Sequence, residues 1–114
     1  MITQLRPSQL GDWLASLPAH SKPVLLDVRE PHEVAFAHVT PPPGLQLLTI
    51  PMGSIPSRLN EIDSEQPVAC LCHHGGRSMQ VAHFLQSHGY DQLANIAGGI
   101  HAWSAEVDPS VPVY

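Results

Sequence analysis

The segment from Cys72 to Ser78 combines a cysteine with residue types that can make its sulfur reactive. An apolar run leads into Cys72, and Gly75, Gly76 and Arg77 follow it closely. Glycines allow the backbone to curl with its amide groups turned inward, and a helix that we expect to begin near Ser78 adds its dipole. Arg77 supplies a permanent positive charge. These groups all favour a thiolate, so the pattern predicts a nucleophilic cysteine.

This activation requires no separate base. Two hydrogen bonds to a charged acceptor contribute ~1.5–3 kcal/mol each, which is sufficient to favour a thiolate. His73 and His74 are close enough in the sequence to reach the site, and we expect them to contact substrate. Nothing in the sequence resembles a catalytic arrangement of Cys, His and Asn or Asp.

Cysteines in such a pattern have two other common roles besides nucleophilic catalysis. A single cysteine is commonly a buried apolar residue, and Cys70 fits that description because it lies inside an apolar run. Zinc is the second alternative, since Cys70, Cys72, His73 and His74 could each bind it. These residues lack the paired spacing of structural zinc sites, and no second ligand pair stands out elsewhere. We therefore predict no metal and no other cofactor.

Apolar runs alternate with helical patterns along the chain, which predicts an α/β domain with a mostly parallel sheet. The expected strands are 2–5, 24–28, 47–50, 68–72 and 93–96. The expected helices are 7–17, 31–37, 54–62, 78–88 and 98–103. Ligands of such sheets bind beyond the carboxyl ends of the strands. Cys72 and the charged residues Asp27, Arg29 and Glu30 all lie at or just beyond the carboxyl ends of expected strands.

Three blocks of sequence, in order, resemble the single-domain rhodanese (thiosulfate sulfurtransferase-like) family. The strongest is Cys72-x-x-Gly75-x-Arg77-Ser78, which resembles the family's active-site loop. The others are 26–30 with Glu33 and His38, and 96–100 with Trp103. The resemblance covers about 5–103. The chain departs from the family where Ala37 replaces the usual glycine, and in the prolines at 41–43.

The resemblance implies a three-layer fold, with a central five-stranded sheet flanked by helices and the active site at its carboxyl edge. It also implies transfer of sulfane sulfur from thiosulfate or a persulfide to cyanide or a thiol, through a persulfide on Cys72. The loop residues expected to bind substrate are His73, His74, Gly75, Gly76, Arg77 and Ser78. Asp27 and Arg29 are expected to brace the site as ions. Glu30 and Glu33 are expected to face solvent or to cap the short helix.

Two other functions remain open on the same fold. One is a non-enzymatic interaction or sensing module, although such modules commonly lack the nucleophile. The other is a phosphatase-like or arsenate reductase-like activity. Those relatives carry one more residue in the loop, whereas four residues separate Cys72 from Arg77 here. The shorter loop favours a single sulfur atom over a tetrahedral oxyanion.

Composition limits the remaining possibilities. The chain has 114 residues, a net charge of -5 and only five scattered lysines and arginines, which disfavours binding to nucleic acid. We expect one domain over 1–114, with a core at about 5–103 and an extended tail at 107–114. Two cysteines do not make a disulfide framework, and no apolar run reaches the ~18 residues of a membrane span. We expect a cytoplasmic protein with no membrane contact, whose partners are small sulfur donors and acceptors and a sulfur-relay protein.

Overall fold

A computed structural model describes residues 2–114 and contains one parallel five-stranded sheet. The strands are β1 (Ile2–Leu5), β2 (Val24–Asp27), β3 (Gln46–Thr49), β4 (Val68–Leu71) and β5 (Leu93–Ile96). They are arranged in the order β1-β5-β4-β2-β3, so β4 lies at the centre. Every pair of neighbouring strands is parallel. The expected α/β fold is therefore confirmed.

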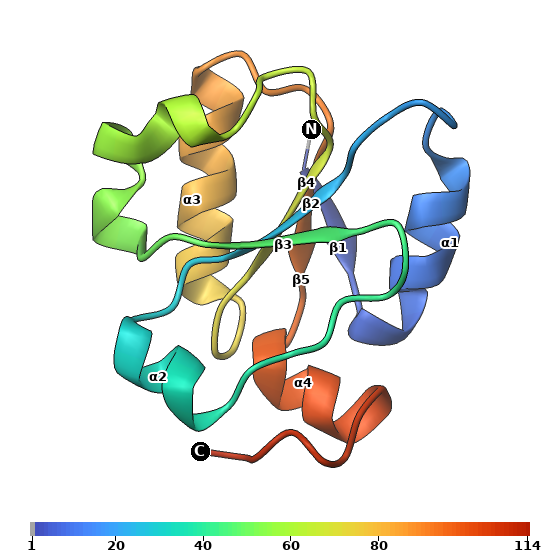
Figure 1. Ribbon diagram of the computed structural model, residues 1–114, viewed down its shortest axis with the longest axis vertical. Helices are drawn as coiled ribbons and strands as arrows, with labels where there is room; N and C mark the ends of the chain where they lie inside the picture. The colour runs from blue at the N-terminus through green and yellow to red at the C-terminus, as the bar shows by residue number, and fades with distance from the viewer. Residues whose placement is uncertain (1) are drawn as a thin grey trace.

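Helices cover both faces of this sheet and make three layers (Figure 1). One face packs against α3 (Gly76–Ser87) and two 3-10 segments, η2 (Met52–Ser54) and η3 (Pro56–Glu61). The other face packs against α1 (Leu10–Ser16), which follows the 3-10 turn η1 (Pro7–Gln9), and against α4 (Gly99–Glu106). All four residues of each of the strands β2, β4 and β5 are buried, as expected for a parallel sheet covered on both sides.

The carboxyl ends of the strands meet at one edge of the molecule. There, α2 (Pro31–Phe36) follows β2, the cysteine loop follows β4, and α4 follows β5. Figure 1 shows these three segments side by side at the lower end of the view, with the end of the chain next to them. The topology thus brings together residues that are far apart in the sequence.

Three expected helices differ in detail. The helix expected over 78–88 begins at Gly76, because Gly75 adopts a left-handed conformation and starts the helix inside the loop. The segment expected as a helix over 54–62 is 3-10 instead, since Pro56 and a non-helical Arg58 interrupt it. The last helix continues past Trp103 to Glu106.

The tail was expected to be extended, which is wrong in its first half. Residues from Asp108 to Val111 form a turn closed by the Val111 amide and the Asp108 carbonyl, 3.1 Å apart. Val111 is buried against the α1 and α4 face, and its carbonyl accepts a hydrogen bond from Ser104. This anchor directs the last residue, Tyr114, to the carboxyl edge of the sheet.

No helix within residues 2–114 has the length and apolar character required to cross a bilayer.

Candidate active site

Cys72 lies directly after β4, with its sulfur inside the curled loop. The backbone N–H of Gly75 donates to Sγ at 3.1 Å, and the Ser78 hydroxyl lies 3.3 Å from it. Gly75 has a φ of 112°, a left-handed conformation that glycine adopts without strain. Cys72 is only 1% exposed. Of these two groups, the Gly75 amide is a donor that the sequence predicts for the sulfur, whereas the Ser78 hydroxyl was expected only to bind substrate.

Ser78 is itself held by Asn95, a residue that the sequence reasoning missed. The Ser78 hydroxyl lies 2.5 Å from Asn95 Oδ1, and the amide of Asn95 donates to Gly75 O at 3.3 Å and to Gln4 Oε1 at 3.1 Å. The strand register places Asn95 beside Cys70, on the face that α3 covers. The available signal was a polar residue in the otherwise apolar run of β5.

The loop carbonyls are fixed by the first turn of α4. Ile100 N–H donates to the Cys72 carbonyl at 2.9 Å, and His101 N–H donates to the His73 carbonyl at 3.2 Å. Gly99 has a φ of 59°, and a Cβ at this position would lie 2.4 Å from each of those carbonyl oxygens. The glycine therefore allows α4 to approach the loop closely.

His73 and His74 lie beside the loop without bonding to the sulfur. Their rings lie with centroids 3.9 Å apart and are tilted by 31°, and His73 stacks on Tyr114 at 3.9 Å and an interplanar angle of 5°. Burial, followed by the neighbouring His74, lowers the pKa of His73, which favours its neutral form. Its buried Nε2 has no hydrogen-bond partner among the described residues. The geometry gives neither histidine the role of a base toward Cys72.

Arg77 is held by Glu33 of α2, which corrects the expectation that Glu33 only faces solvent or caps a helix. The two terminal nitrogens of Arg77 donate to the two oxygens of Glu33, at 2.7 and 2.9 Å. Glu33 also accepts the Glu30 N–H at 3.0 Å, so the capping role exists as well. The Arg77 hydrogen bond holds the pKa of Glu33 well below its usual range.

Asp27 and Arg29 form a second, fully buried ion pair at the end of β2. Arg29 donates to both oxygens of Asp27, at 2.9 and 2.7 Å. Its Nη1 also donates to the Tyr114 hydroxyl at 3.0 Å, and that hydroxyl donates to Glu33 at 2.9 Å. Burial opposes the charge of Arg29, but these hydrogen bonds outweigh it and raise the pKa. The structure confirms that Asp27 and Arg29 are paired as ions, and their role in bracing the site stays a prediction.

Tyr114 is a second residue that sequence reasoning missed. It connects the two ion pairs through its hydroxyl and covers His73 with its ring. No sequence signal was available, because the residue lies in an irregular segment whose path depends on buried contacts elsewhere.

Cys70 lies two residues earlier, in the interior of β4. It is fully buried among apolar side chains, and burial raises the pKa of its thiol to about 12. This environment agrees with the expected inert role. No cluster of three or more metal-binding side chains exists among residues 2–114.

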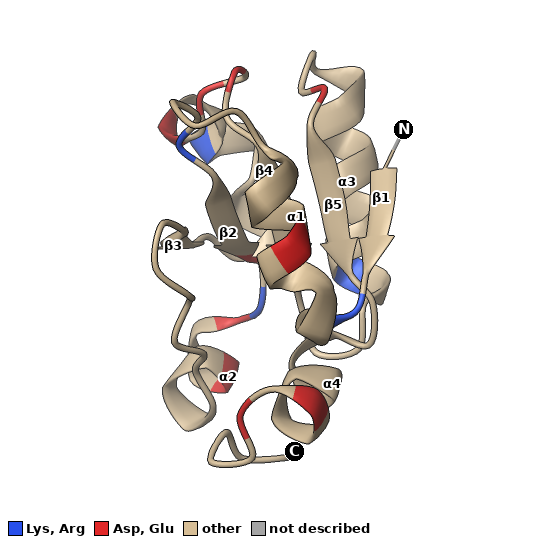
Figure 2. Cartoon of the chain, turned by 90° about the vertical axis from the view of Figure 1, so that its right-hand side faces the viewer, with Lys and Arg blue, Asp and Glu red and all other residues tan. Residues whose placement is uncertain are grey.

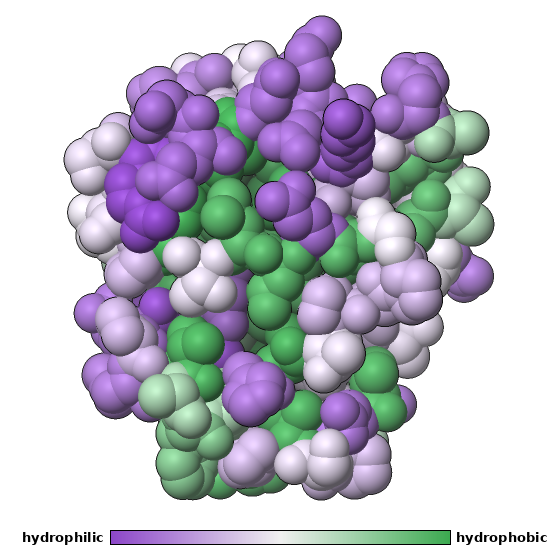
Figure 3. Space-filling view, viewed as in Figure 1, coloured by the Kyte–Doolittle hydropathy of each residue, from purple (hydrophilic) through white to green (hydrophobic). Residues whose placement is uncertain are grey.

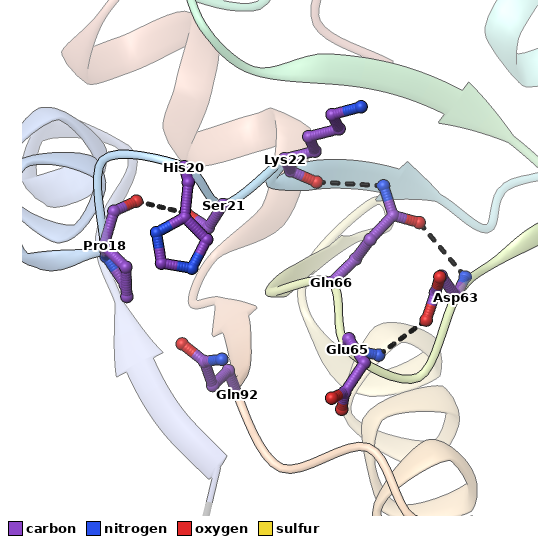
Figure 4. A pocket seen from close by; sticks show the side chains of 8 residues that line it. All are labelled: Pro18, His20, Ser21, Lys22, Asp63, Glu65, Gln66 and Gln92. Carbon is purple, nitrogen blue, oxygen red and sulfur yellow. Dashed lines mark hydrogen bonds between the residues drawn. The ribbon is translucent and has the colours of Figure 1, made fainter.

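The opposite edge of the sheet carries a polar hollow of about 450 Å³ at the amino ends of the strands (Figure 4). Its groups satisfy one another: Gln66 bonds to the carbonyl of Lys22 and to the amide of Asp63, at 2.9 and 3.1 Å. Its lining residues are Pro18, His20, Ser21, Lys22, Asp63, Glu65, Gln66 and Gln92. It has no cysteine, and the carboxyl edge is therefore the candidate site.

Comparison with known proteins identifies the family of this chain. The sequence profile of the "Rhodanese-like domain" family matches residues 10–106. The chain belongs to the rhodanese-like domain family. A protein named "Sulfurtransferase" from Allochromatium vinosum is 39% identical over 111 residues, covering 97% of this chain and 96% of its own. Membership and this relative support sulfur transfer as the general class of activity.

Two further relatives extend the comparison. The crystal structure of a rhodanese-like domain protein from Staphylococcus aureus has a TM-score of 0.71 and 31% identity, and each chain is covered to 99%. A chloroplastic protein of Arabidopsis thaliana, "Rhodanese-like/PpiC domain-containing protein 12", is 42% identical over 92 residues. That match covers 79% of this chain but only 30% of the Arabidopsis protein, so the rhodanese-like domain also occurs within longer proteins.

Proposed function

We propose that this rhodanese-like domain transfers sulfane sulfur from thiosulfate or a persulfide to cyanide or a thiol, with Cys72 as the carrier. The observation that carries the proposal is the hydrogen bond that the Gly75 amide donates to Cys72 Sγ at 3.1 Å. Hydrogen bonds to a charged sulfur are among the stronger ones in proteins. They stabilise the thiolate that must attack the donor.

The reaction has two displacements. In the first, the Cys72 thiolate attacks the outer sulfur of the donor, the donor's S–S bond breaks, and its electron pair leaves with sulfite or a thiolate. In the second, cyanide or a thiolate attacks the terminal sulfur of the persulfide, and the electron pair returns to Cys72 Sγ. The Gly75 amide donates to Sγ and faces its charge at the start and end of this cycle.

Mass spectrometry after mixing with thiosulfate or an organic persulfide tests the proposal. We expect a gain of one sulfur mass on Cys72, its removal by cyanide, and no gain in Cys72→Ser. Cys70→Ser is the matched control, because it removes the neighbouring thiol and should still take up sulfur. Absence of an adduct with every sulfane donor would contradict the proposal and favour an interaction module.

The proposal also includes the cell compartment and the partner of the protein. Both cysteines are free, and a reducing compartment such as the cytoplasm would keep Cys72 available. A sulfur-relay protein is the macromolecular partner that this chemistry requires if the acceptor is a protein thiol. An assay that follows a labelled sulfur from Cys72 to an acceptor protein measures such a transfer directly.

A further inference from the structure

The charged side chains around the Cys72 loop cancel one another. Arg29 is paired with Asp27, and Arg77 is paired with Glu33. Two cations therefore face two carboxylates at this edge. Because the field that reaches an approaching ligand is the sum of all these charges, the edge has no net positive charge to attract a dianion.

No other strong cation replaces them. The chain has five lysines and arginines, and among residues 2–114 each of the four arginines forms a salt bridge with a carboxylate. The fifth cation, Lys22, lines the hollow at the opposite edge. Figure 2 shows how few blue segments the chain has. The lowered pKa of His73 keeps the imidazole next to Cys72 neutral at neutral pH.

The pairing of Arg77 is tight. Both terminal nitrogens are used, and the side chains of Arg77 and Glu33 are 32% and 11% exposed. Two parallel hydrogen bonds between a guanidinium and a carboxylate are a strong arrangement. An anion that approaches the exposed part of Arg77 is therefore also repelled by Glu33, which is bound to both terminal nitrogens of Arg77.

The surface next to this pair is largely apolar. Phe36 and Tyr114 pack edge to face with centroids 5.9 Å apart, and with His32 and Glu33 they line a hollow of about 480 Å³. Phe36 is 59% exposed. Figure 3 shows hydrophobic colouring around α2, whereas the top of the molecule is mostly hydrophilic. An apolar surface of this kind favours contact with an organic group over contact with a hydrated inorganic ion.

We propose that the site selects organic sulfane donors with at most one negative charge, such as alkyl or aryl persulfides and thiosulfonates, over the thiosulfate dianion, and that Glu33 sets this selectivity by neutralising Arg77. The inference rests on the proposed sulfur transfer through Cys72. With an organic persulfide, the Sγ–S bond forms, the donor's S–S bond breaks, and its electron pair leaves on the organic thiolate. The proton on the transferred sulfur moves with it, so atoms and charge balance.

Two donors that differ in charge test the selectivity in the wild-type protein. Benzenethiosulfonate is a monoanion in which a phenyl ring replaces one oxygen of thiosulfate, and it transfers the same outer sulfur. We would measure kcat/KM for thiocyanate formation from each donor, divided by the rate of that donor with a small thiol in solution. We expect the normalised value to be at least ~tenfold higher for benzenethiosulfonate, because the site repels the second charge and receives the ring.

The variant Glu33→Gln tests the cause. Gln keeps an acceptor for the Glu30 amide but releases the charge of Arg77. We expect kcat/KM to rise ~tenfold for thiosulfate and ~threefold for benzenethiosulfonate, because electrostatic energy scales with the charge of the donor. Glu61→Gln is the matched control, since it breaks the exposed Arg58–Glu61 pair with the same change in net charge. It should change neither value by more than ~twofold.

The double variant Glu33→Gln/Arg77→Gln tests whether the effect of Glu33→Gln comes from the charge of Arg77 or from the changed shape of the site. If the charge is the cause, removing Arg77 as well should abolish the rise in kcat/KM for thiosulfate. The inference is overturned if the wild type uses both donors equally after normalisation, or if Glu33→Gln and Glu61→Gln behave alike. In either case a sulfur adduct on Cys72 would leave the proposed function standing. No adduct with either donor would overturn the proposed function itself.

Discussion

The interior of β4 and the loop that follows it each carry a buried cysteine, and the two differ in chemistry although they are two residues apart. Cys70 and Cys72 are 0% and 1% exposed and belong to the same apolar cluster on one face of the sheet. Burial alone therefore does not distinguish them. Cys70 sits where the backbone amides are used by neighbouring strands, whereas Cys72 sits where the Gly75 amide and Ser78 hydroxyl reach its sulfur. At the end of a strand, where ladder hydrogen bonding stops, a backbone amide is free to donate to a buried sulfur.

The largest effect should come from deforming the loop while leaving β4 intact. Gly99→Ala forces a Cβ against the carbonyls of Cys72 and His73 at 2.4 Å, from a left-handed backbone. We expect sulfur transfer to fall ~100-fold, because a displacement of about 1 Å at reacting groups has this effect. Steady-state thiocyanate formation measures it.

Gly11→Ala in α1 is the control for that substitution. A Cβ there has nothing within 4 Å, so the variant should keep full activity and gain ~0.5–1 kcal/mol of stability. Equal activity in both variants would show that contact between α4 and the loop does not position Cys72.

An effect of intermediate size should appear in the pH dependence of the free energy of unfolding, and the Cys70 thiol should cause it. Its pKa in the folded state is about 12, against an ordinary value near ~8.5. The folded state therefore keeps a proton that the unfolded state loses, and stability falls as pH rises above ~8.5. From pH ~8.5 to ~10 this contribution amounts to about 1.5 kcal/mol.

Urea unfolding of the wild type and Cys70→Ala at several pH values measures that loss. The variant should be less stable at neutral pH, because it leaves a small cavity, but its stability should fall less steeply in alkali. Parallel curves for the two proteins would show that Cys70 ionises freely in the folded protein and would contradict this prediction.

The smallest effect should come from the hydroxyl of Tyr114, which lies between the two ion pairs next to the Cys72 loop. Tyr114→Phe keeps the ring that stacks on His73 but removes the hydroxyl between Arg29 and Glu33. Since Asp27 and Arg77 still pair these charges and Tyr114 is partly exposed, we expect a loss of about 1 kcal/mol in the free energy of unfolding. Chemical denaturation measures it, and Tyr114→Ala should lose more because the stack is also removed. Equal losses would assign the whole contribution to the hydroxyl.

Local sequence signals were reliable where the contacts are local. The five strands and the helix after Pro7 follow from apolar runs and from prolines and glycines at their ends, and the structure confirms them within a few residues. The segment around Pro56 was harder, because apolar spacing at 55, 59 and 62 does not distinguish an α-helix from two short 3-10 turns. The start of α3 was missed because Gly75 and Gly76 were interpreted only as loop residues.

The sequence by itself determined the parallel α/β fold and the chemistry of the Cys72 loop, because Gly75 and Ser78 lie within six residues of the sulfur they contact. Tertiary structure alone decided which partners the charged groups take. Glu33 lies 44 positions from Arg77, and Tyr114 lies 85 from Arg29. Asn95 reaches Ser78 across 17 positions through the register of β5 and β4. Ion pairs and hydrogen bonds depend on distance in space, and only the folded chain sets that distance.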